Sequence, residues 1–241
     1  MSESAMNDIE GLVLHRDDKA DRLAERVAQD VATALGQALD ERGAATLVVS
    51  GGSTPGPMFA RLRRLPLDWS RVTITLADER VVEPQDEQSN ERLLRQSLLQ
   101  DEAAAARFVS LYEAGLDGAG SDAALARVRA RIEALPRPFD VVLLGMGGDG
   151  HTASLFPDAA ELEGAMQAEA ATAVALLRPP SQPLVRISLV ARRLIDTRHL
   201  WLHITGESKR VLLKRGLATG SSPVARVLQA ADTDRAIYWA P

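Results

Sequence analysis

A glycine-rich segment past the middle of the chain holds the residues best suited to catalysis. It reads Gly145-Met146-Gly147-Gly148-Asp149-Gly150-His151-Thr152. Because each glycine costs conformational entropy on folding, this density predicts a close approach of the backbone to a ligand, which we expect Gly147 and Gly148 to contact. Asp149 and His151 are two residues apart, so a tightly turned loop can direct both at one pocket. A histidine beside a carboxylate is typical of a general base that works near neutral pH.

A second segment, Ser50-Gly51-Gly52-Ser53-Thr54-Pro55, lies between an apolar run and an expected helix. Its glycines allow a tight turn that exposes successive backbone N–H groups, and the helix start adds a partial positive charge. Residues 50–54 are therefore predicted to bind a phosphate, with hydroxyl donors from Ser53 and Thr54. The simpler alternative is a strand-to-helix turn that Ser or Thr caps. No Gly-Lys-Ser/Thr follows, so this is not a Walker loop, and Pro55 replaces the last glycine of a nucleophile elbow.

Charged residues follow other expected strands. Asp78-Glu79-Arg80 comes at the end of the strand expected over 72–76, where Arg80 is suited to hold a phosphate or to stabilise an oxyanion. Lys209 lies in the first turn of the helix that Gly206 opens, within reach of an anion at the same sheet edge. Further candidates for the anion are Arg186, Arg192 and Arg193. The plain alternative for each is a solvated ion pair or an exposed side chain.

Other histidines are not expected to bind a metal. His199 and His203 are four residues apart in an expected strand, so they share a face without being close enough for a typical metal pair. No third ligand is near them in the sequence, and we interpret both as structural. The chain has no cysteine, which excludes disulfides, thiolate nucleophiles and cysteine-based zinc sites.

Short β-branched or leucine-rich runs alternate with longer runs of helical periodicity. The expected strands cover residues 46–49, 72–76, 139–144, 185–190, 199–204 and 236–239. The expected helices cover 17–41, a segment after Pro55, 89–99, 121–135, a segment after Gly206, and 223–229. This alternation predicts a Rossmann-like, doubly wound α/β fold, with a largely parallel sheet, helices on both faces, and ligands at the carboxyl ends of the strands. We expect one domain over residues 1–241, with the alanine runs 103–106 and 168–175 as loop or helix.

Composition narrows the range of partners. Aromatic residues make up 4% of the 241 residues and the formal net charge is −5, which argues against nucleic acid and anionic membranes as partners. No apolar run approaches the roughly 20 residues of a membrane span, and residues 1–10 do not resemble a signal peptide. We expect a cytoplasmic protein, a monomer or small homo-oligomer, that acts on a small molecule.

In combination, these segments resemble the 6-phosphogluconolactonase family. The matching stretches, in the family's order, are 50–55, 76–82, Ser89-Asn90, 139–157 and 205–209. Gly-Gly-Asp-Gly-His-Thr-Ala-Ser-Leu-Phe-Pro, from Gly147 to Pro157, is far more specific than a glycine pattern alone. The family is similar to the glucosamine-6-phosphate isomerases/deaminases and shares their α/β fold. The deaminases follow the equivalent histidine with an acidic residue, whereas residues 152–156 here contain none, which favours the lactonase.

The resemblance implies hydrolysis of 6-phospho-D-glucono-1,5-lactone to 6-phospho-D-gluconate in the oxidative pentose phosphate pathway. A lactone carbonyl is already electrophilic, so water needs a base and the oxyanion needs a donor, but no metal or cofactor is required. By this resemblance His151 takes the proton from water and returns it to the ring oxygen. Asp149 orients His151 or binds a sugar hydroxyl.

The same resemblance assigns the binding residues. The 50–54 segment and a cation such as Lys209 or Arg193 hold the phosphate, and Arg80 serves the phosphate or the oxyanion. Asp78 and Asn90 complete the expected substrate contacts.

Three alternatives stay open at this point. One is an aldose–ketose isomerase–deaminase on the same fold, and another is a sugar-phosphate sensor without catalysis. The chain lacks a helix-turn-helix or basic appendage, which argues against the sensor. The third is a nicotinamide-dependent dehydrogenase, because the 145–150 segment matches Gly-x-Gly-x-x-Gly, although that fingerprint usually opens the first βαβ unit.

Overall fold

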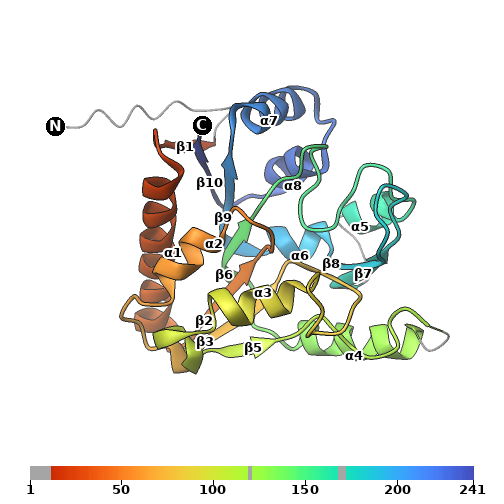
Figure 1. Cartoon of the computed structure of the whole chain (residues 1–241), viewed down its shortest axis with the longest axis horizontal. Helices are drawn as coiled ribbons and strands as arrows, with labels where there is room; N and C mark the ends of the chain where they lie inside the picture. The colour runs from red at the N-terminus through yellow and green to blue at the C-terminus, as the bar shows by residue number, and fades with distance from the viewer. Residues whose placement is uncertain (1–11, 119–120, 168–171) are drawn as a thin grey trace.

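The computed structural model describes residues 12–118, 121–167 and 172–241. Within them, seven strands form one sheet in the order β1-β10-β9-β6-β2-β3-β5, and every neighbouring pair is parallel (Figure 1). Its strands are β1 (Val13–Arg16), β2 (Ala45–Val49), β3 (Val72–Leu76), β5 (Arg107–Val109), β6 (Phe139–Leu144), β9 (Thr197–Thr205) and β10 (Asp234–Ala240). The predicted parallel α/β sheet is confirmed.

Helices lie on both sides of this sheet, with α1 and α2 on one side and α6 and α8 on the other (Figure 1). The helices are α1 (Ala20–Arg42), α2 (Gly56–Leu62), α3 (Asn90–Ser97), α4 (Ser121–Glu133), α5 (Leu162–Met166), α6 (Ala191–Ile195), α7 (Glu207–Thr219) and α8 (Pro223–Ala230). Short 3-10 turns cover Trp69–Arg71 and Asp101–Ala105. None of the described helices is both long and apolar enough to cross a membrane.

Helix α1 shows how the sequence pattern produces an element. Apolar residues at three- and four-residue spacing, among them Leu23, Val27 and Val31, are buried against the sheet. The helix ends at Gly43, whose φ of 77° is the left-handed conformation that a helix C-terminus favours. The Gly43 N–H donates to the carbonyl of Leu39 at 3.0 Å. The expected helix over 17–41 is therefore confirmed to within three residues.

A second, antiparallel sheet of three strands was not expected. It consists of β4 (Asp78–Arg80), β8 (Arg186–Leu189) and β7 (Val174–Leu177) in the order β4-β8-β7. The strand expected over 185–190 exists, but it joins this small sheet and not the parallel one. The prediction of loop or helix for 168–175 is wrong at Val174 and Ala175, which pair with β8, and residues 168–171 lie outside the described part.

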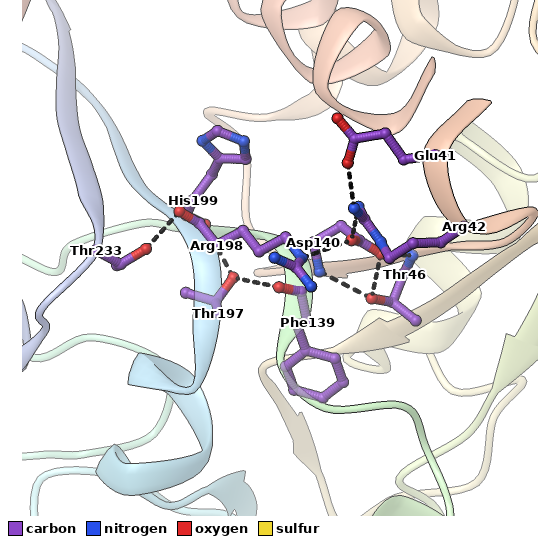
Figure 2. Close-up of polar contacts among 9 residues, drawn as sticks. All are labelled: Glu41, Arg42, Thr46, Phe139, Asp140, Thr197, Arg198, His199 and Thr233. Carbon is purple, nitrogen blue, oxygen red and sulfur yellow. Dashed lines mark hydrogen bonds and ion pairs between the residues drawn. The ribbon is translucent and has the colours of Figure 1, made fainter. Parts of the chain in front are cut away.

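A buried carboxylate fixes the edge of the parallel sheet where its strands begin (Figure 2). Asp140, on β6, is 5% exposed. Its Oδ2 accepts hydrogen bonds from the backbone N–H of Thr46 at 2.7 Å and the Thr46 hydroxyl at 2.9 Å. Its Oδ1 accepts one from Arg42 Nη2 at 2.7 Å, and Arg198 Nε lies 3.5 Å away. This network joins β2, β6, β9 and the end of α1.

Candidate active site

A pocket of about 270 Å³ opens where β2, β3, β6 and β9 end. Most of the predicted site residues line it. They are Ser50, Gly51, Gly52, Ser53, Thr54, Asp78, Arg80, Asn90, Gly147, His151 and Lys209. Asp149, Gly148 and Arg193 do not line it. Ligand sites at the carboxyl ends of strands are the rule for parallel α/β sheets, because the connecting loops gather there.

The His151 ring is fixed from two sides. Its Nδ1 lies 2.5 Å from Asp149 Oδ1, and the same oxygen accepts the His151 backbone N–H at 3.1 Å. The ring stacks on Phe156 with centroids 4.0 Å apart. Because the carboxylate accepts the Nδ1 proton, the neutral ring presents the lone pair of Nε2. Asp149 thus holds the His151 ring from beside the pocket.

Gly147 is required by the position of this ring. A Cβ at residue 147 would lie 2.0 Å from His151 Cε1, far inside van der Waals contact. The loop closes on itself through a hydrogen bond from Gly147 N–H to the His151 carbonyl at 3.0 Å. Gly148 is exposed and does not reach the pocket, so the predicted ligand contact at Gly148 is not supported.

The 50–54 segment lines the pocket with unused donors. Among the hydrogen bonds of the described residues, none uses the backbone N–H of Gly51, Gly52, Ser53 or Thr54. A turn before a helix with several free N–H groups is a site for an anion. Gly51 also packs so closely on Asn90 that a Cβ there would lie 2.0 Å from Asn90 Oδ1.

Arg80 and Asn90 support each other beside this turn. Arg80 Nη1 donates to Asn90 Oδ1 and to the Gln88 carbonyl, each at 2.8 Å. Asn90 Nδ2 donates to the Asp78 carbonyl at 2.9 Å. The buried Nε of Arg80 has no partner among the described residues. Arg80 therefore has an unpaired donor, and its two hydrogen bonds fix its orientation at the pocket wall.

Glu79 faces away from the pocket, although the sequence groups it with its charged neighbours. Its side chain is fully buried and accepts the backbone N–H groups of Asn90 at 2.7 Å and Glu91 at 2.6 Å, which begin helix α3. Burial raises the pKa of Glu79, and these donors oppose the rise. The alternation of side chains along β4 explains the division: Asp78 and Arg80 point into the pocket and Glu79 anchors α3.

Arg193 is not a pocket residue, which corrects one prediction. Its guanidinium is fully buried, 3.6 Å from the centroid of the Phe139 ring at the start of β6. Its Nη1 lies 3.3 Å from Asp196 Oδ2 and its Nη2 donates to the Pro136 carbonyl at 3.1 Å. Arg193 therefore lies at the opposite end of the strands from the glycine segments.

Arg186 takes the place that was expected for Arg193. It lines the pocket, pairs in register with Arg80 across β4 and β8, and is 7% exposed. Its Nη2 donates to Gln182 Oε1 at 2.8 Å, while its buried Nε has no partner among the described residues. Burial and the charge of Arg80 lower the pKa of Arg186. Two adjacent guanidiniums with free donors form a site that an anion stabilises.

Lys209 and His203 line the same pocket. Lys209, in the first turn of α7, forms no ion pair in the described part of the chain. His203, which we interpreted as structural, is 4% exposed in the pocket wall. His199 lies outside the pocket, with Nδ1 2.8 Å from Asp234 Oδ2, in agreement with a structural role. The sequence signal that distinguishes the two histidines is the position of His203 at the carboxyl end of β9.

No group of three or more His, Cys, Asp or Glu side chains suited to a metal occurs among the described residues. The parallel sheet, the histidine–carboxylate pair and the free N–H groups define an α/β protein built to bind and act on a small anionic substrate.

The chain belongs to the family described as glucosamine-6-phosphate isomerases/6-phosphogluconolactonase, whose model matches residues 18–239. A 6-phosphogluconolactonase of Rhizobium meliloti (strain 1021) is 42% identical over 95% of this chain and 98% of its own. A crystal structure of a 6-phosphogluconolactonase from Shewanella baltica OS155 has a TM-score of 0.90 and 37% identity, over 98% of this chain and all of that one. A monomeric glucosamine-6-phosphate deaminase, 18% identical with a TM-score of 0.73, shares the fold.

Proposed function

We propose that this chain hydrolyses 6-phospho-D-glucono-1,5-lactone to 6-phospho-D-gluconate in the oxidative pentose phosphate pathway, in the cytoplasm. The observation that carries the proposal is the pair His151–Asp149, which presents a free Nε2 in a pocket with unused N–H donors and three cations, Arg80, Arg186 and Lys209. The relatives named 6-phosphogluconolactonase, which match nearly the whole chain, support it.

In the proposed mechanism, His151 acts as the general base. Its Nε2 takes a proton from water as the water oxygen attacks the lactone carbonyl carbon. The tetrahedral oxyanion is stabilised by Arg80, whose orientation Asn90 fixes. Collapse of the intermediate breaks the bond between the carbonyl carbon and the ring oxygen, which takes the proton back from His151. The products are the open-chain hydroxyl and the carboxylic acid, which then ionises.

The phosphate is held in the same pocket, at the turn of residues 51–54 that lies beside Asn90 and Arg80. The free N–H groups of 51–54 surround it, and Lys209 and Arg186 supply full positive charges. Binding energy from this group positions the carbonyl against His151, because the phosphate itself does not react.

The test is hydrolysis of freshly prepared 6-phosphogluconolactone, measured as acid release against the spontaneous rate, with and without a chelator. We expect a rate well above the spontaneous one that chelation does not reduce. A matched control is His199→Ala, which changes a histidine of β9 outside the pocket and should leave the rate unchanged. Loss of activity on chelation, restored by a divalent metal, contradicts the mechanism, and a rate equal to the spontaneous one contradicts the function.

A deaminase reaction is the competing activity on this fold. Residues 152–156, which follow His151, contain no acidic side chain. We therefore expect no ammonia release from glucosamine 6-phosphate under conditions where the lactone is hydrolysed.

A further inference from the structure

The imidazole of His203 is a buried polar group without a protein partner. It is 4% exposed, and neither Nδ1 nor Nε2 has a hydrogen-bond partner among the described residues. The residue lies near the carboxyl end of β9 and forms part of the pocket wall together with Lys209.

Burying the imidazole of His203 without a hydrogen-bond partner lowers the stability of the folded chain. A buried donor or acceptor that leaves water without a new partner costs about 1–3 kcal/mol, and buried polar groups in native proteins are nearly always paired. His199, four residues earlier on the same face of β9, shows the usual solution, because Asp234 accepts its Nδ1 proton. His203 has no such partner among the described residues, but it lines the pocket, where a ligand can supply one.

The charges around His203 indicate which ligand group this is. Burial and the positive charge of Lys209 lower the pKa of His203 to about 4, so the ring is neutral at physiological pH. A neutral imidazole offers one N–H donor and one acceptor. Lys209, whose positive charge acts on His203, also attracts an anion.

We propose that His203 is a specificity residue of the pocket. It donates a hydrogen bond to an oxygen of the substrate phosphate, the same phosphate that Lys209 binds. This assignment rests on the proposed function. Because His203 then contacts a group of the substrate that does not react, it should raise kcat/KM for phosphorylated lactones and not for their unphosphorylated analogues.

The test compares two variants on two substrates. His203→Phe keeps a flat ring but removes the donor, and His203→Gln keeps a donor. For 6-phosphogluconolactone, His203→Phe should lower kcat/KM by about 10- to 100-fold, mainly through KM, and His203→Gln should recover most of the loss. For unphosphorylated glucono-1,5-lactone, both variants should stay within about twofold of the wild type. His199→Phe, on the same strand face outside the pocket, is the matched control and should change neither.

Stability separates this role from a structural one. His203→Phe breaks no hydrogen bond in the described part of the chain, so its free energy of unfolding at neutral pH should not fall. A destabilised variant that slows both lactones equally would show that His203 acts on the fold. An unchanged kcat/KM for the phosphorylated lactone would also overturn the assignment.

Binding without turnover keeps this proposal separate from the proposed function. Calorimetric titration with 6-phosphogluconate and with inorganic phosphate should show weaker binding by His203→Phe than by the wild type. If the wild type hydrolyses no lactone but this difference persists, the proposed reaction fails and the role of His203 stands. If the wild type hydrolyses the lactone but both proteins bind equally, or if neither protein binds, the role of His203 is overturned.

Discussion

The ring of His151 and the carboxylate of Asp149 form one unit, with Nδ1 2.5 Å from Oδ1. Asp149 also accepts the backbone N–H of His151, so a single carboxylate sets both the loop conformation and the tautomer of the ring. The unit leaves Nε2 as the only ring nitrogen of His151 that is available to a substrate water.

This coupling predicts how substitutions combine. His151→Ala should lower kcat by roughly 10²- to 10⁴-fold with a smaller effect on KM, the usual contribution of a positioned general base. Asp149→Asn should lower kcat less, and the double variant should be no slower than His151→Ala alone, because Asp149 acts through His151. Steady-state kinetics of the three variants measure this. A double variant that is much slower than His151→Ala would show that Asp149 contacts the substrate directly.

Lys209 should act on the phosphate only. Lys209→Ala should penalise the phosphorylated lactone by roughly 1.5–3 kcal/mol in kcat/KM, the range for a hydrogen bond to a charged group. The unphosphorylated lactone has no such anion and should be hydrolysed nearly as before. If both substrates slow equally, Lys209 acts on the reacting centre or on the fold.

The neighbouring arginines should differ in the same comparison. Arg80→Gln should lower kcat for both lactones, because Arg80 is assigned to the oxyanion that both substrates form. Arg186→Gln should lower kcat/KM for the phosphorylated lactone and spare the other, because Arg186 is assigned to the phosphate. Steady-state kinetics of both variants on both lactones test these assignments. If Arg186→Gln slows both lactones and Arg80→Gln slows only the phosphorylated one, the two roles are exchanged.

His203 should make stability sensitive to acid. Its pKa is about 4 in the native state and about 6.5 in the unfolded chain, so between these values the native state binds fewer protons. Stability is therefore lost as the pH falls through this window, by about 2 kcal/mol at pH 5 relative to neutral pH. Urea unfolding at both pH values measures it, and His203→Phe should lose about 2 kcal/mol less than the wild type. Equal losses would contradict a neutral, buried His203.

Asp140 should matter for stability and not for catalysis. Asp140→Asn weakens the ion pair with Arg42 and the bonds to Thr46 shown in Figure 2, and should lower the free energy of unfolding by about 2–4 kcal/mol. Glu41→Gln removes an exposed partner of the same arginine and should cost under about 1 kcal/mol. Chemical unfolding of both variants gives the comparison, and kcat should be unchanged in each. Equal costs would show that the buried network adds nothing.

Local pattern was enough to predict the parallel sheet and two of its loops. Strand β3 (Val72–Leu76) and strand β6 (Phe139–Leu144) match the expected ranges, because buried strands are continuous apolar runs that end at glycine or charge. The glycine segments then meet in space, since parallel strands bring all of their carboxyl ends to one edge. His151 could be identified from the sequence for the same reason.

Only the tertiary structure decided which charged residues from distant parts of the sequence join the glycine segments in the pocket. Arg186 lies in the pocket and Arg193 does not, because β8 pairs antiparallel with β4 across roughly a hundred residues of sequence, a non-local contact that no local pattern encodes. In the sequence, His199 and His203 differ only in their position along β9. The folded chain shows that His199 has Asp234 as its partner, whereas His203 lines the pocket and neither of its ring nitrogens has a hydrogen-bond partner among the described residues. Residue type and periodicity determined the scaffold and the segment that holds His151, whereas long-range pairing and side-chain burial determined which cations and donors line the pocket.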